Sequence, residues 1–118
     1  MREDLRERTK RYALRIIRMY GALPKETVAQ VIGKQVLRSG TSVGANFREA
    51  YRARSNNEFV AKLGICLQEL EETIYWLELL CEANIWSENQ LSELLDESNQ
   101  LIAIFTTISK NRKKARNI

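Results

Sequence analysis

Apolar residues recur along the chain at intervals of three and four, the spacing of amphipathic α-helices. The first such segment covers about residues 3–20, and its apolar positions are Leu5, Tyr12, Ile16, Met19 and Leu23, with Ala13 and Ile17 beside them. After a turn that contains Pro24, a second segment covers about residues 25–53, with an apolar face of Val28, Ile32, Val36, Val43, Phe47 and Ala50. Residues 39–44 are poor helix formers, but the period continues through them, so we predict one continuous helix, straight or kinked.

Two capping boxes predict the starts of two further helices. The run Ser55-Asn56-Asn57-Glu58 precedes a helix that ends near residue 83, and Ser87-Glu88-Asn89-Gln90 precedes one that ends near residue 110. Short connections favour antiparallel neighbours. The sequence therefore predicts an all-α, up-down-up-down four-helix bundle over residues 1–110, followed by a basic C-terminal tail over residues 111–118.

The third predicted helix carries more apolar surface than one bundle stripe requires. One seam contains Phe59, Leu63, Cys66, Leu70, Thr73, Leu77 and Leu80, and a second line contains Val60, Leu67, Ile74 and Cys81. Either this helix is buried at the centre of the fold, or its excess apolar surface faces another subunit. We favour a homo-oligomer, with an interface at Val60, Leu67, Ile74 and Trp76.

The residues needed for most catalytic and metal sites are absent from the 118-residue chain. It has no histidine and two cysteines, which removes Ser-His and Cys-His pairs, most zinc sites and the usual di-iron ligands. The sequence thus predicts no enzyme, metal, cofactor or small-molecule substrate. The charged N-terminus lacks the apolar core of a signal peptide, and no apolar stretch could span a bilayer, so we expect a cytoplasmic protein without a membrane partner.

Charge is divided unevenly along the chain, although the net charge is only +4. Residues 1–54 carry a net charge of +8, residues 55–109 carry −9, and residues 110–118 carry +5. Three explanations stay open: pairing within the chain, pairing between subunits of a ring, and phosphate binding by RNA-contacting residues. The candidate nucleic-acid-binding residues are Arg8, Arg11, Arg15, Arg18, Lys34, Arg38, Arg48, Arg52, Arg112, Lys113 and Lys114.

A polar and small stripe follows one face of the second predicted helix. It contains Gln35, Ser39, Ser42, Asn46 and Glu49, with Arg38 beside it, and the glycines nearby allow close approach of another helix. The stripe indicates a specific helix–helix contact, and a ligand or RNA site is the alternative.

These residues also carry a family resemblance. The run from Gln35 to Ala50, then Arg54-Ser55 and Glu58-Phe59, resembles the bacterial four-helix-bundle family named for proteins encoded in 23S ribosomal RNA intervening sequences. The shared motif is Gln-x-x-Arg-Ser/Ala-x-x-Ser-x-x-x-Asn-x-x-Glu-Ala/Gly, and many members have proline where this chain has Gly44. The resemblance implies a four-helix bundle, a pentameric ring and an association with RNA, with no catalytic residues to transfer. A related group comprises accessory proteins of diversity-generating retroelements, which engage a reverse transcriptase and its RNA.

Two functional hypotheses follow. The first is a homo-oligomer, with a pentamer favoured, that binds RNA or a reverse transcriptase–RNA complex through its basic residues. The second is a structural or adaptor oligomer that binds another protein and no nucleic acid.

Overall fold

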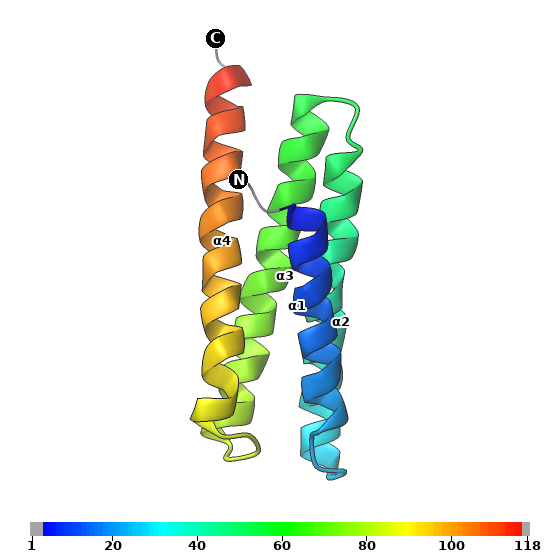
Figure 1. The fold of residues 1–118 in the computed structure, drawn as a ribbon, viewed down its shortest axis with the longest axis vertical. Coiled ribbons are helices and arrows are strands. Elements are labelled where there is room, and N and C mark those ends of the chain that lie inside the picture. Colours follow the sequence, from blue (N-terminus) through cyan, green and yellow to red (C-terminus); the bar gives the residue numbers. More distant parts are fainter. Residues whose placement is uncertain (1–3, 117–118) are drawn as a thin grey trace.

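Consecutive helices of the chain run in opposite directions along a single bundle (Figure 1). The computed structural model describes the backbone of residues 4–116 and the side chains of residues 4–114. Its helices are α1 (Leu5–Gly21), α2 (Thr27–Tyr51), α3 (Asn56–Glu82) and α4 (Glu88–Arg116). The predicted all-α four-helix bundle is confirmed, and the described part of the chain contains no strand. None of the helices within residues 4–116 is long and apolar enough to cross a membrane.

Side-chain caps begin three of the four helices. The Ser55 hydroxyl accepts a hydrogen bond from the Glu58 N–H, and the Glu58 carboxylate accepts one from the Arg54 N–H. Ser87 and Gln90 form the second predicted capping box, in which each side chain accepts a hydrogen bond from the backbone N–H of the other residue. Asp4 caps α1 by accepting from the Arg6 N–H, a cap that was not predicted from the sequence. Each cap satisfies N–H groups that have no partner inside the helix.

The α1–α2 turn extends two residues further than the sequence predicted. The side chain of Gln30 accepts a hydrogen bond from the Tyr20 hydroxyl and donates one to the Pro24 carbonyl, so it ties α1, the turn and α2 together. Helix α2 begins at Thr27 rather than directly after Pro24.

Helix α2 continues unbroken through residues 39–44, as predicted. The hydroxyls of Ser39, Thr41 and Ser42 donate to carbonyls four residues earlier, so they add to the helical hydrogen bonding. A Cβ on Gly40 would lie 2.8 Å from Cγ1 of Ile16 on α1. Glycine is therefore required here because α1 packs directly against the α2 backbone.

The core of the bundle follows the predicted faces closely on α3 and less closely on α2. Six of the seven seam positions of α3 are buried, and Phe59 is partly buried. On α2, however, Val28 is 57% exposed, and Ala29 and Gly33 face the core instead. At Gly33 the interior has no room for a larger side chain, because an added Cβ would lie 2.5 Å from Cδ1 of Leu23. Leu23 and Tyr20 fill the space beside Gly33. Ile17 is also exposed, at 47%.

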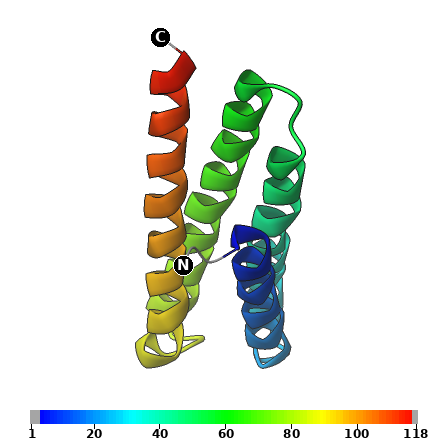
Figure 2. The same ribbon diagram turned by 45° about the horizontal axis from the view of Figure 1, so that its top comes forward.

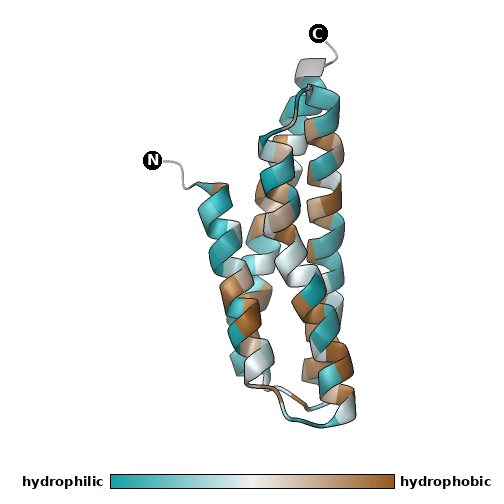
Figure 3. Ribbon diagram, turned by 90° about the vertical axis from the view of Figure 1, so that its right-hand side faces the viewer, coloured by the Kyte–Doolittle hydropathy of each residue, from teal (hydrophilic) through white to brown (hydrophobic). Residues whose placement is uncertain are grey.

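Helix α4 is longer than predicted, and α1 is too short to cover it. The 29 residues of α4 continue in helical conformation to Arg116, while α1 has 17 residues. The basic segment from residue 111 to 116 is thus part of a helix, and residues 117 and 118 lie outside the described residues. Helices α1 and α4 barely touch, and α4 stands apart from α1 in Figure 2. Hydrophobic and hydrophilic residues alternate along the helices, as expected of amphipathic helices (Figure 3).

Candidate nucleic-acid interface

The antiparallel fold gathers basic residues from distant segments at one end of the bundle. The start of α1, the end of α2 and the end of α4 all lie toward this end (Figure 1). We call this surface the basic end and define it by Arg6, Arg48, Arg52, Arg112, Lys113 and Lys114. The acidic side chains beside it include Asp4, which pairs with Arg6, and Glu49, which pairs with Lys62 on α3. The local charge is therefore positive.

Three of the predicted RNA-contacting residues form ion pairs with acidic residues of α3 or α4. The Arg8 guanidinium lies 2.7 Å from Glu97, and both side chains are mostly covered. Arg15 lies 3.8 Å from Glu93, and Arg38 bridges two acids of α3. Pairing within the chain, one of the three explanations left open by the sequence, thus accounts for part of the basic charge.

The other predicted contacts lie on the surface. Arg11, Arg18, Lys34, Arg48, Arg52, Arg112, Lys113 and Lys114 are all exposed. Among the described residues, Arg18, Lys34, Arg48, Arg52, Lys113 and Lys114 make no hydrogen bond or ion pair through their side chains. Arg18 and Lys34 lie away from the basic end, whereas the other four of these six belong to it. The structure thus brings together only part of the predicted set.

An exposed aromatic ring lies among the arginines of the basic end. Tyr51, the last residue of α2, is 57% exposed, and the Arg6 guanidinium lies 4.0 Å from the centre of its ring. Asp4 holds Arg6 in place through hydrogen bonds, which lower the pKa of the Asp4 carboxyl. A small pocket of about 290 Å³ is lined by Arg6, Arg48, Glu49, Tyr51 and Arg52.

Tyr51 was not among the RNA-contacting residues predicted from the sequence. A usable signal was present: Tyr51 lies three residues after Arg48 and directly before Arg52, outside the predicted apolar face of its helix. The position of Arg6 over the ring could not be read from the sequence, because α1 and α2 meet only in the fold.

A larger, mainly apolar groove of about 790 Å³ opens next to Tyr51, between the start of α1 and the end of α4. Phe47, Phe59, Ile104 and Ile108 supply much of its lining, and Tyr51 lies on its edge. At its rim, the Arg112 guanidinium lies 4.3 Å from the ring centre of Phe59 and donates to the Asn56 amide oxygen. The groove exists because α1 is too short to cover this part of α4.

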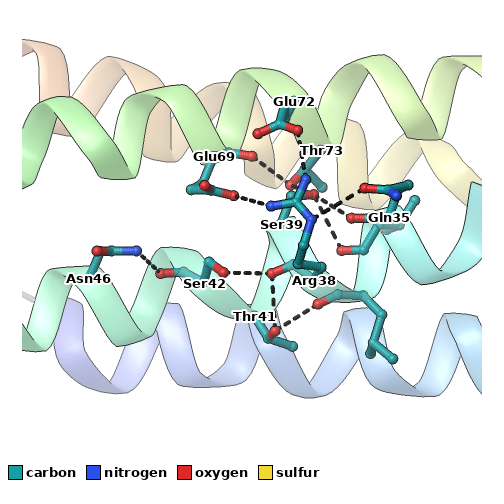
Figure 4. A network of polar contacts seen from close by, with 11 residues as sticks. Gln35, Arg38, Ser39, Thr41, Ser42, Asn46, Glu69, Glu72 and Thr73 are labelled. Carbon is teal, nitrogen blue, oxygen red and sulfur yellow. Dashed lines mark hydrogen bonds and ion pairs between the residues drawn. The ribbon is translucent and has the colours of Figure 1, made fainter.

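The polar stripe of α2 faces α3, and its contacts are shown in Figure 4. The Ser39 and Thr73 hydroxyls lie 2.7 Å apart in the interior. Arg38 donates to the carboxylates of Glu69 and Glu72 and to the side-chain oxygen of Gln35. Burial, with a smaller contribution from Glu72, raises the pKa of Glu69. Through these contacts the stripe joins α2 to α3.

The remaining stripe residues bond mostly within α2. The Asn46 amide donates to the Ser42 carbonyl, and the Ser42 hydroxyl donates to the Arg38 carbonyl. Glu49 accepts from Lys62 on α3.

The four predicted oligomer-interface residues are all partly exposed in the single chain. Leu67 and Trp76 pack against the core, and the Trp76 indole N–H is buried without a hydrogen-bond partner among the described residues. More exposed apolar side chains lie elsewhere, on α1 and α2: Leu14, Ile17, Val28 and Val31. That surface was not predicted from the sequence.

Two comparisons with known proteins give the same family. The model of the family described as 23S rRNA-intervening sequence protein matches residues 3–107. A similar solved structure is that of a protein with unknown function from the S23 ribosomal protein family of Bacteroides thetaiotaomicron. It is 38% identical, the match covers 91% of this chain and 99% of that chain, and the TM-score is 0.85. No curated protein matches the chain at a significant level. Neither likeness points to an enzyme family.

Proposed function

The chain belongs to the 23S rRNA-intervening sequence protein family. We propose that it is a non-enzymatic, RNA-associated protein whose basic end binds the phosphate backbone. The observation that carries the proposal is the cluster of exposed cations there. Arg48, Arg52, Lys113 and Lys114 are exposed and form no ion pair within the described chain. Such cations release condensed counterions when they contact phosphates, which supplies sequence-independent affinity.

The other candidate cations contribute unequally to the proposal. Arg11, Arg18 and Lys34 extend the basic surface away from the basic end. Arg8, Arg15 and Arg38 are paired with acidic residues of α3 or α4 and would have to leave them to bind RNA. We therefore assign these three arginines a smaller share of the phosphate contacts. The cost of leaving the acidic partner is largest for Arg8, whose ion pair is mostly covered, and smaller for Arg15 and Arg38, whose pairs are more exposed.

Titration of RNA at several salt concentrations tests the proposal. We expect log affinity to fall linearly with log salt, with a slope of several units. The double variant Lys113→Gln, Lys114→Gln should reduce that slope by about 2, because each phosphate contact contributes about one unit. The matched control is Lys10→Gln, Lys25→Gln, which removes two exposed lysines outside the basic end. Absence of RNA binding at low salt contradicts the proposal.

The second part of the proposal is self-association in the cytoplasm, with a pentamer favoured by the family resemblance. The partly exposed Val60, Leu67, Ile74 and Trp76 on α3 support a shared apolar surface. Native mass spectrometry of the purified chain should give one oligomeric species together with any bound RNA. We expect Ile74→Glu to dissociate it, because a charge would be buried at the interface. Ala61→Glu, at an exposed position of α3 outside the predicted interface, is the control. A monomeric wild-type chain contradicts this part.

A further inference from the structure

Tyr51 combines an exposed ring with a fixed position. It remains 57% exposed although the Arg6 guanidinium lies over the ring at 4.0 Å. One face of the ring therefore lies against the Arg6 guanidinium, while the residue as a whole stays more than half exposed. Arg6 is itself held by the Asp4 carboxylate at 3.0 Å. The position of the ring is thus supported from α1 as well as from its own helix.

The surroundings of Tyr51 divide into a cationic side and an apolar side. The small pocket beside the ring contains Arg6, Arg48 and Arg52, with Glu49 as its acidic lining residue. Since Glu49 pairs with Lys62, the pocket keeps its positive charge. The large groove begins at the same ring and continues past Phe59 and Ile104. Tyr51 lines both the small pocket and the large groove, so a molecule that contacts the ring can also contact the arginines and the apolar surface.

A nucleotide of a single strand has the matching chemistry. Its base is a flat apolar face that stacks on aromatic rings without regard to sequence, and its phosphates bind arginines. Unpaired bases are required because the faces of paired bases are covered in a duplex. An acidic peptide would also be attracted by the arginines, but its carboxylates do not use an exposed ring.

We propose that Tyr51 stacks with an unpaired RNA base while Arg48 and Arg52 contact the phosphates on either side of it. This inference rests on the proposed RNA association and adds the form of RNA that is recognised. It predicts a preference for single-stranded loops and ends over a continuous duplex.

Fluorescence anisotropy of the full chain with a labelled single strand and with a duplex of equal length tests the inference. Tyr51→Leu should weaken single-strand binding by about tenfold or more, the usual effect of losing one stacked base. Duplex binding should change by less than about twofold, because phosphate contacts remain. Tyr51→Phe should bind as the wild type does, because the ring is kept. The salt slope should stay unchanged in Tyr51→Leu and fall by about 1 in Arg48→Gln.

The chain provides a matched control in Tyr75. This residue of α3 is 55% exposed, close to the value for Tyr51, but its helical neighbours Glu71, Glu72 and Glu78 are acidic. Tyr75→Leu should leave both affinities unchanged. Circular dichroism of each variant checks that the bundle is folded.

The outcomes separate the two proposals. If the wild type binds no RNA, both fail. If it binds RNA with a steep salt dependence and folded Tyr51→Leu binds single strands equally well, the stacking inference fails and RNA association stands. If an acidic peptide competes for the site and loses affinity in Tyr51→Leu as RNA does, the surface recognises protein and the inference is overturned.

Discussion

The guanidinium of Arg8 donates two hydrogen bonds to the carboxylate of Glu97, at 2.8 and 2.7 Å, and thereby joins α1 to α4. The residues are 89 positions apart in the sequence, and Arg8 also donates to the side-chain oxygen of Gln100. The Tyr12 and Ser98 hydroxyls, 2.6 Å apart, form a second link between these helices. These polar pairs join two helices whose backbones come close at few positions.

Loss of the Arg8 side chain should therefore weaken the bundle. Arg8→Met leaves the Glu97 carboxylate mostly covered and unpaired, which we expect to cost about 1–3 kcal/mol of unfolding free energy. Urea denaturation at one protein concentration measures it, since the stability of an oligomer depends on concentration.

The double variant Arg8→Met, Glu97→Met should recover much of that loss, because the unpaired charge is removed as well. Arg18→Met, at an exposed position, is the control and should change stability by less than about 0.5 kcal/mol. Equal losses of unfolding free energy in Arg8→Met and Arg18→Met would show that the Arg8–Glu97 ion pair does not stabilise the fold.

Two glycines should respond oppositely to alanine. At Gly40, a Cβ would lie 2.8 and 3.0 Å from the branched carbons of Ile16, which is fully buried. We expect Gly40→Ala to destabilise the fold by about 1 kcal/mol or more, because overpacking exceeds the gain in helix propensity. A Cβ on Gly64 of α3 would meet no atom within 4 Å, so Gly64→Ala should stabilise by about 0.5–1 kcal/mol.

Thermal denaturation of both variants distinguishes these effects. A higher melting temperature in Gly40→Ala, as expected for Gly64→Ala, would contradict the direct packing of α1 against the α2 backbone at Gly40.

The hydroxyl pair between α2 and α3 should behave as a coupled unit. Ser39 and Thr73 lie 2.7 Å apart, and each is also bonded to a carbonyl of its own helix. We expect Ser39→Ala and Thr73→Val each to cost about 1 kcal/mol. The double variant should cost less than the sum by about 0.5 kcal/mol or more. A urea-based double-mutant cycle measures this coupling, and strict additivity would contradict it.

Stability should fall at alkaline pH because two buried groups resist ionisation. Burial raises the pKa of the Cys66 thiol to about 12, and burial raises the pKa of Tyr12 to about 12 despite its bond to Ser98. In the unfolded chain the pKa values of cysteine and tyrosine are about 8.5 and 10. The folded state then keeps protons that the unfolded chain has lost, so unfolding becomes more favourable as pH rises from about 8.5 towards 12.

Replacing Cys66 tests the thiol's share of this pH dependence. Urea denaturation across that range should show a shallower decline in Cys66→Ala than in the wild type. Cys81→Ala is the control, because Cys81 is only partly buried. An identical decline in the wild type and Cys66→Ala would contradict the assignment.

Local patterns were sufficient to predict the four helices. The recurrence of Tyr12, Ile16 and Met19 and the boxes at Ser55 and Ser87 depend on residues three or four positions apart. Such neighbours meet within the helix itself, whatever the tertiary fold. The burial of Ala29 in place of Val28 on α2 shows the limit, because the residue that faces the core depends on how α2 packs against its neighbours.

Local patterns alone therefore predicted the fold class, the starts of α3 and α4, the division of charge and the family motif. Which charges are paired and which stay exposed depends on how the helices pack. Arg8 and Arg48 were both predicted to contact RNA. In the fold, however, Arg8 pairs with Glu97, and Arg48 lies in the pocket beside Tyr51. The reason is physical: the partners of a side chain between helices depend on how whole helices pack, and that packing brings together residues that no local pattern connects.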